Sequence, residues 1–151
     1  MTKKTAWLSN EEYHRIFSQT PRICVDLVIM VGGKLLLTKR KIAPYKGTWH
    51  FPGGRILMGE AIAEARLRVF KKELGLKKIA VKKMKLLGAM EFPRDGGYHS
   101  ISVAFLVKLS EKQFKQIRID EQACGIKLVD IKNLPSRMHP IHRKFLQSLS
   151  L

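Results

Sequence analysis

The segment that most constrains the fold is a helix predicted over residues 61–74. Ala, Leu, Glu and Lys recur there with helical periodicity, and Gly75 directly after them is typical of a helix end. The preceding residues 43–54 contain proline, glycine and aromatic residues without periodicity, so they are predicted to form a structured loop. The remaining elements are predicted on either side of this loop and helix.

The rest of the chain is mainly strands. Ser9 and Glu12 form a capping-box pattern that predicts a short helix over residues 10–19. Apolar, β-branched runs around turn residues predict two hairpins. The predicted strands and final helix cover residues 22–31, 34–40, 78–92, 99–109, 125–130 and 139–149. Because the helices are dispersed among more numerous strands, the pattern indicates an α/β protein with a mixed sheet and helices on its faces.

Length and composition predict one domain. The chain has 151 residues, of which 45% are hydrophobic and 27% charged, which suits a single domain over residues 1–151 with a sizeable core. No apolar run reaches the roughly 18 residues that a membrane span needs. Cys24 and Cys124 are too few to form a disulfide scaffold. We therefore expect a cytoplasmic protein with reduced thiols and no membrane partner.

The charge balance is less ordinary. Lys and Arg number 29 against 12 Asp and Glu, which gives a net charge of +17. Three explanations are open at this point. The excess suits a nucleic-acid binder that neutralises phosphates, an enzyme whose field attracts phosphorylated small molecules, or a solvated basic surface without specific meaning.

The segment Gly53 to Leu76 carries a recognisable motif, GGRILMGEAIAEARLRVFKKELGL. It resembles the Nudix box, written G-x5-E-x7-R-E-U-x-E-E-x-G-U, in which U is a bulky aliphatic residue. The positions that fit the box are Gly54, Glu60, Arg68, Phe70, Glu73, Gly75 and Leu76. The resemblance implies a Nudix fold, an α/β/α sandwich with a mixed central sheet.

Two box positions depart from the family pattern. Val69 and Lys72 stand where the box has glutamates, and only Glu73 of that carboxylate cluster remains. Residues 69, 72 and 73 share one face of a helix. Because several hard oxygen ligands are needed to hold two or three Mg²⁺ ions, we expect at most one Mg²⁺ here. Because fewer cations offset the negative charge of the diphosphate, attack on phosphorus is disfavoured, whereas substitution at carbon stays feasible.

Both departures are similar to those of the GDP-mannose mannosyl hydrolases within the family. This resemblance implies Mg²⁺-dependent hydrolysis of a nucleotide sugar, GDP-mannose or GDP-glucose, at the sugar C1, with release of nucleoside diphosphate and sugar. It implies Gly53, Glu73 and Gln122 as metal ligands, and Asp26, Arg55 and Glu73 as catalytic residues. It further implies that Asp26, Arg40, Arg55 and Arg68 contact the substrate, although Arg68 could equally pair with Glu60.

The general base is not assigned by the resemblance. The subgroup has a histidine directly after the glutamine, and this chain has Ala123, which cannot take a proton. The open candidates are His50, His99, Glu121 and Cys124. Tyr45, Phe92 and His99 are candidate walls for a base or sugar. His139 and His142 are predicted to lie on a solvated helix face, and the lysines of segment 77–85 on the outer side of a strand.

Two alternatives stay open. One is a nucleoside-diphosphate pyrophosphatase that attacks phosphorus with ligands from outside the box. The other is a non-catalytic module that binds nucleotide or RNA through Lys72 and the basic surface. A nucleic-acid partner is the less favoured interpretation of the charge. A homodimer is expected only on the general frequency of such assemblies.

Overall fold

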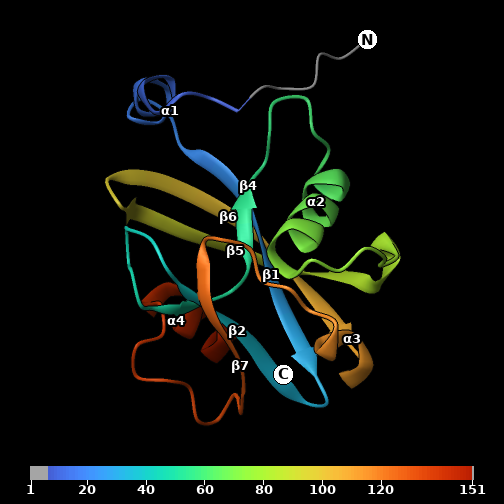
Figure 1. Ribbon diagram of the computed structural model, residues 1–151. Helices are drawn as coiled ribbons and strands as arrows, with labels where there is room; N and C mark the ends of the chain where they lie inside the picture. The colour runs from blue at the N-terminus through green and yellow to red at the C-terminus, as the bar shows by residue number, and fades with distance from the viewer. Residues whose placement is uncertain (1–6, 151) are drawn as a thin grey trace.

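The structure is a computed structural model and describes residues 7–150 (Figure 1). Its α-helices are α1 (Asn10–Phe17), α2 (Ile62–Leu74), α3 (Glu111–Lys115) and α4 (Pro140–Ser148), and η1 (Val81–Lys83) is a 3-10 turn. Its strands are β1 (Arg22–Val31), β2 (Lys34–Arg40), β3 (Trp49–His50), β4 (Gly53–Arg55), β5 (Met84–Asp95), β6 (Tyr98–Leu109) and β7 (Ala123–Val129).

The box helix α2 begins and ends where local chemistry dictates. Glu64 accepts a hydrogen bond from the Ala61 N–H at 2.9 Å, which satisfies one of the free donors at the helix start. Gly75 ends the helix with φ of 65°, and its N–H donates to the Lys71 carbonyl at 2.9 Å. Only glycine adopts that left-handed conformation without strain, which explains the sharp stop.

The central sheet is mixed and runs in the order β3-β2-β1-β6-β5. β1 and β6 are parallel from Arg22↔Ser100 to Val31↔Leu109, and the β1–β2 and β5–β6 pairs are antiparallel. The first half of β1 also pairs with β4, so that Asp26 lies opposite Gly53. The box loop is therefore joined directly to the strand that carries Asp26.

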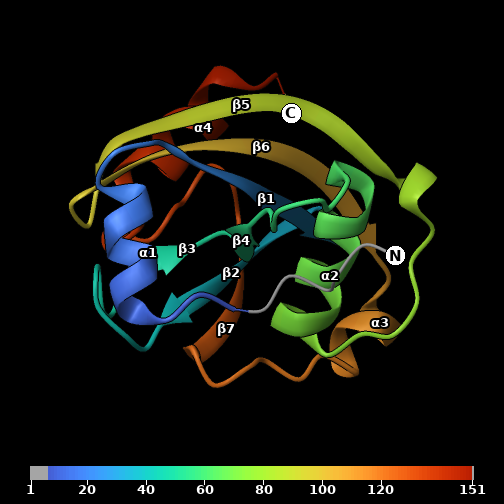
Figure 2. The same ribbon diagram turned by 90° about the horizontal axis from the view of Figure 1, so that it is seen from above.

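Helices cover both faces of the sheet. The core on one face joins alternate β1 residues such as Val25 and Leu27 to Val69 and Phe70 of α2. The core on the other face joins Val28 and strand β2 to Leu146 of α4. Figure 2 shows α1 apart from these layers, beside the start of β1. The α/β/α sandwich with a mixed sheet is confirmed.

Several elements differ from the prediction. Residues 43–54 are not all loop, because β3 and β4 form short pairs with β2 and β1 there. The strand predicted from residue 78 begins only at Met84, after the turn η1, so Lys77, Lys78, Lys82 and Lys83 precede the strand. Helix α3 was not predicted, although Ser110 and Gln113 form a capping box.

No helix within residues 7–150 is long and apolar enough to cross a membrane.

Candidate active site

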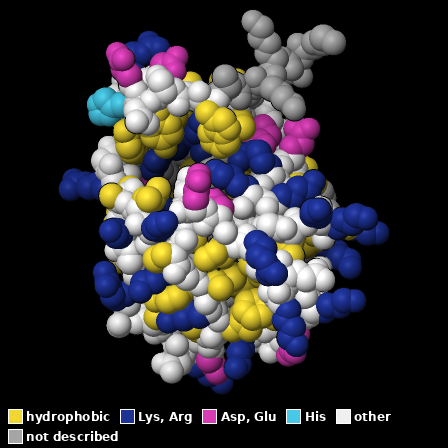
Figure 3. All heavy atoms as spheres, in the orientation of Figure 1, with side chains coloured by type: hydrophobic (Ala, Val, Ile, Leu, Met, Phe, Trp, Pro, Cys, Tyr) yellow, Lys and Arg dark blue, Asp and Glu magenta, His cyan; other side chains and the backbone are white. Residues whose placement is uncertain are grey.

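A cavity of about 590 Å³ lies between α1, β1, β4, the β5–β6 turn and the start of α4. Figure 3 shows the molecule hollowed beneath α1 at this place. The cavity lining includes three predicted site residues with charged side chains, Asp26, Arg40 and Arg55. A smaller hollow of about 200 Å³ adjoins it and contains Arg68, Val69, Lys72 and Glu73 of α2. Gly53, Arg55 and Gln122 line both, so the structure brings the predicted residues to two connected hollows.

Asp26 is the buried carboxylate of the larger cavity, with 8% of its surface exposed. The Ser102 hydroxyl, from the neighbouring strand β6, donates a hydrogen bond to its Oδ2. Burial raises the pKa of Asp26 to about 7, and the Ser102 hydrogen bond opposes this shift. A side chain at Gly53 would collide with the Asp26 carboxylate, so glycine is required opposite it. Asp26 can therefore exchange a proton near neutral pH.

His142 lies on α4 and approaches Asp26 on the face of the sheet that Asp26 shares with Val28. Its Nδ1 accepts a hydrogen bond from the Phe51 N–H at 3.1 Å, and its ring stacks on that of Phe51 with centroids 4.2 Å apart. In the neutral form the proton is therefore on Nε2, which lies 3.9 Å from Asp26 Oδ1. Burial holds the pKa of His142 well below its usual range, so the ring is neutral.

The predicted solvated position of His139 and His142 is wrong. They are only 7% and 5% exposed, and both line the larger cavity. His139, His142 and Leu146 recur at spacings of three and four residues, so they share the inward face of α4. Ile141 and Phe145, which suggested a different inward face, are only partly buried. His139 caps the helix, since its Nδ1 accepts from the Ile141 N–H at 3.3 Å.

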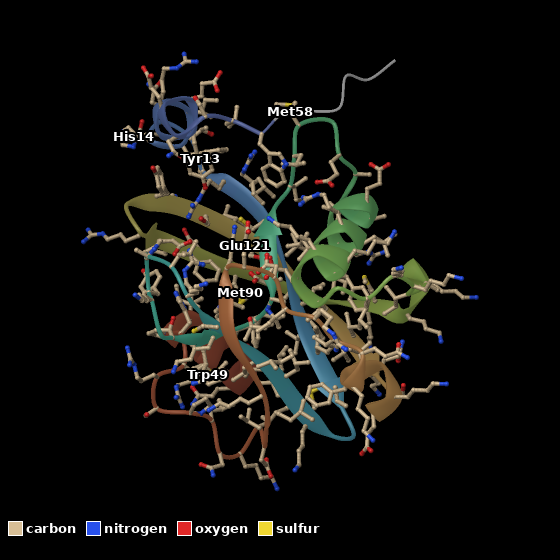
Figure 4. All side chains as sticks on the ribbon, in the orientation of Figure 1. Tyr13, His14, Trp49, Met58, Met90 and Glu121 are labelled. Carbon is tan, nitrogen blue, oxygen red and sulfur yellow. The ribbon has the colours of Figure 1, made fainter. Side chains whose placement is uncertain are left out.

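The candidate general bases differ in whether they line the cavity. His50 lines the cavity, and its Nδ1 lies 2.6 Å from the Phe51 carbonyl, which leaves Nε2 as an acceptor in the neutral ring. Burial lowers the pKa of His50 to about 4. His99 instead pairs with Glu91 at 3.0 Å on the exposed surface and does not line the cavity. Glu121, labelled in Figure 4, and Cys124 are exposed near the start of β7.

Of the three residues predicted as walls for a base or sugar, two line the cavity. Tyr45 and Phe92 line the cavity, and their rings contact that of His139 with centroids 4.8 and 5.4 Å apart. His99 does not take part in this wall.

The arginines have different surroundings. The Arg55 guanidinium faces the rings of Tyr13 and Phe17 at 5.7 and 5.2 Å. Arg68 forms a 2.6 Å ion pair with Glu60 and also donates to the Arg55 carbonyl at 2.7 Å. These contacts support the structural interpretation of Arg68, which ties the box helix to the loop before it.

Arg22 and Tyr13 are among the cavity residues that the sequence analysis did not single out. Arg22 lines the cavity, where its guanidinium donates to the Tyr13 hydroxyl and to Asp95, each at 2.7 Å. Figure 4 shows Tyr13 directed from α1 toward the strands. Nothing in the sequence distinguishes Arg22 from other basic residues at strand ends. Tyr13, Ile16 and Phe17 recur at helical spacing, and this was the available signal that α1 turns a face toward the rest of the protein.

Glu73 and Gln122 line the smaller hollow, and Asp120, which does not line it, is close enough to influence Glu73; together they have the chemistry of a divalent-cation site. Glu73 is 8% exposed, and burial together with the negative charge of Asp120 raises its pKa to about 7. No group of the described residues forms a hydrogen bond with the buried Asp120 Oδ2, while Oδ1 accepts from the Gln122 N–H at 3.0 Å. A cation would compensate both features, and oxygen donors suit Mg²⁺. Within residues 7–150, however, no three His, Cys, Asp or Glu side chains cluster as a complete metal site.

These features define a class of protein: an α/β/α sandwich whose box loop, box helix and first strand surround one connected pair of hollows. The family model of the NUDIX domain matches residues 20–149, and the chain belongs to this family.

Two named proteins are similar to this chain in sequence. An ADP-ribose pyrophosphatase of Methanocaldococcus jannaschii is 37% identical over 117 residues, which are 76% of this chain and 65% of that protein. The chain thus spans slightly less than two thirds of that relative. The low-salt glycan biosynthesis protein Agl8 of Haloferax volcanii is 29% identical, with 97% of this chain and 94% of that protein covered.

Among solved structures, the fold is similar to a MutT NUDIX hydrolase from Burkholderia pseudomallei. The TM-score is 0.74 at 25% identity, and the match covers 87% of this chain and 99% of that one. The NUDIX domain of Shewanella oneidensis NrtR, solved with ADP ribose, has a TM-score of 0.68 at 20% identity, with 93% and 96% covered. The second likeness concerns the fold alone.

Proposed function

We propose that this protein hydrolyses a nucleotide sugar of the GDP-mannose or GDP-glucose type at the sugar C1, releasing nucleoside diphosphate and sugar. The observation that carries the proposal is the single carboxylate, Glu73, that α2 presents to the smaller hollow. The proposal treats residues 1–151 as one catalytic domain of the GDP-mannose mannosyl hydrolase type.

The other two box positions cannot contribute negative charge. Val69 is 1% exposed and belongs to the core. Its Cγ2 is so close to Gly54 that a Cβ atom at position 54 would lie 3.1 Å from it. The Lys72 ammonium lies 5.0 Å from the centre of the Trp7 ring and adds positive charge at the rim. Attack on phosphorus needs strong charge compensation at the electrophile, and this helix supplies little of it.

The larger cavity suits reaction at carbon. Asp26 is a buried carboxylate with a pKa near neutrality; Ser102 donates a hydrogen bond to it, and Nε2 of the neutral His142 ring lies 3.9 Å from its Oδ1. It is the group best placed to take the proton of an attacking water. Arg40 and Arg55 line the same cavity and would stabilise the negative charge of a departing nucleoside diphosphate.

Glu73, Gln122 and the Gly53 carbonyl would hold Mg²⁺, with Asp120 as a further carboxylate from outside the box. When bound, the ion supplies charge compensation for the diphosphate. Glu73→Gln should abolish turnover and also remove the rise in melting temperature that Mg²⁺ causes in the wild type. Glu111→Gln, on α3, is the matched control and should retain both. A mutant E73Q that keeps the Mg²⁺ response would exclude Glu73 as a ligand.

A second candidate is attack on phosphorus, favoured by the 37% identity to a protein named ADP-ribose pyrophosphatase. Asp120 gives this alternative one of the extra ligands that it needs. Product analysis separates the two. Reaction of GDP-mannose at C1 yields GDP and mannose, whereas attack between the phosphates yields GMP and mannose 1-phosphate. Turnover of ADP-ribose to AMP and ribose 5-phosphate, without GDP-mannose turnover, would reject the first proposal.

Light scattering of the purified protein tests whether it is a homodimer in solution.

A further inference from the structure

A second pair of hollows lies on the flank of α2 that faces away from the candidate active site. Their volumes are about 440 and 400 Å³, and they share Lys77, Lys78 and Gln113. Leu67 and Lys71 line this flank, whereas Arg68, Val69 and Glu73 line the active-site flank of the same helix. The two adjoining hollows form one groove between the end of α2, segment 75–83 and α3.

Lysines dominate this groove. Of the residues that the structure describes, no acidic side chain lines the groove, and five lysines do: Lys71, Lys77, Lys78, Lys83 and Lys108. All five are exposed, and none of the ion pairs formed within residues 7–150 involves a lysine. Figure 3 shows Lys and Arg side chains gathered along the edge where α2 and segment 75–83 lie in Figure 1. The chain has no acidic residue between Glu73 and Glu91.

The composition of the groove identifies the chemistry that it can bind. Lysine acts as a point charge toward phosphate, without the planar two-pronged contacts of arginine. No aromatic ring from the described part of the chain lines the groove, so bases would have no surface there to stack on. None of the large exposed apolar side chains lines it either, so it lacks the groups that insert into a lipid surface.

We propose that this groove, lined by Lys71, Lys77, Lys78, Lys83 and Lys108, binds the phosphate backbone of a nucleic acid without sequence preference. It is separate from the hydrolytic site and does not depend on the function proposed for that site. It also accounts for a part of the net charge of +17 that the active site leaves unexplained.

The test compares two variants of equal charge. Lys77→Gln/Lys78→Gln/Lys83→Gln removes three groove lysines, and Lys34→Gln/Lys132→Gln/Lys144→Gln removes three exposed lysines elsewhere. Binding of a labelled RNA oligonucleotide of mixed sequence is measured by fluorescence anisotropy over a salt series. The groove variant should bind at least tenfold more weakly at low salt. Its slope of log affinity against log salt should fall by about two, since each neutralised phosphate contributes about 0.7.

The control variant should retain at least half of the affinity and the full salt slope. Equal losses in both variants would show that the net charge, and not the groove, binds RNA, and would overturn the proposal. So would an unchanged groove variant, or binding to phosphatidylserine vesicles or inorganic polyphosphate without binding to RNA. GDP-mannose hydrolysis, measured on the same samples, should be equal in all three proteins. This readout distinguishes failure of the groove proposal from failure of the hydrolase proposal.

Discussion

Asp26 connects the sequence and the site most directly. It interrupts an apolar run whose neighbours Val25 and Leu27 are fully buried, and a carboxylate there is costly unless a function or a partner retains it. The family resemblance implied Asp26 as a site residue, and its place in this apolar run agrees with that assignment. The sequence could not locate Ser102 or His142, because the strand pairing and the position of α4 bring them to Asp26 from 76 and 116 residues further along the chain.

The raised pKa of Asp26 predicts a pH-dependent stability. The folded protein keeps the Asp26 proton up to about pH 7, whereas the unfolded chain releases it near 3.8. This contribution to stability is therefore full at low pH and is lost as pH rises toward 7. Asp26→Asn removes the buried charge. Relative to wild type, its free energy of unfolding should gain on the order of 2–3 kcal/mol between about pH 5 and pH 8.

Urea unfolding at several pH values, in the presence of EDTA, measures this difference. Comparing the variant with wild type cancels the opposite pH dependence of the buried histidines, whose lowered pKa values reduce stability at acid pH. A stability difference that does not change with pH would show that Asp26 ionises normally in the folded protein.

His142 offers a second prediction at the scale of one residue. His142→Asn keeps an acceptor for the Phe51 N–H but removes the Nε2–H that faces Asp26. We expect kcat to fall about tenfold with little change in KM, because the interaction orients a reacting group and does not bind substrate. His99→Asn, on the exposed surface, should leave both unchanged. A normal kcat in H142N would remove His142 from the mechanism.

At the scale of elements, the sequence predicted best where local signals agree with the fold. The first hairpin and α2 lie where turn glycines and helical periodicity place them. The short strands β3 and β4 were not predictable, because two or three residues have no detectable periodicity and their pairing partners lie elsewhere in the chain. Basic and apolar residues alternate in segment 78–83 as they do in a strand, but this segment has none of the strand pairings that begin at Met84.

The end of α2 gives a prediction about folding energy. A side-chain carbon on Gly75 would lie 2.8 Å from the Arg118 carbonyl oxygen, in addition to the strain of its positive φ. Gly59 has a positive φ of 78°, but no atom of residues 7–150 would lie within 4 Å of a side-chain carbon there. Gly75→Ala should therefore destabilise the protein by roughly 1–3 kcal/mol, and Gly59→Ala by about 1 kcal/mol. Chemical denaturation of both variants measures this. Equal losses would mean that the Arg118 contact costs nothing.

At the scale of the whole molecule, the fold class followed from the order of elements and from the box spacing, and the mixed sheet confirms it. The positions of the charges did not follow. The sequence shows an excess of lysine, but only the structure separates the arginines of the cavity from the lysines on the far flank of α2. A part of the basic charge therefore lies at two separate sites, arginines at the cavity and lysines at the groove, with different chemistry in each.

The central claim is that the bond between the sugar C1 and the diphosphate oxygen breaks. Hydrolysis of GDP-mannose in ¹⁸O-labelled water with Mg²⁺ tests this claim most directly. Attack at the sugar C1 places the label in mannose and leaves GDP unlabelled, as detected by mass spectrometry of both products. This is the result that we predict from the single carboxylate of α2 and the buried Asp26. Label in a phosphate of either product, the nucleotide or mannose 1-phosphate, would contradict it and establish attack on phosphorus.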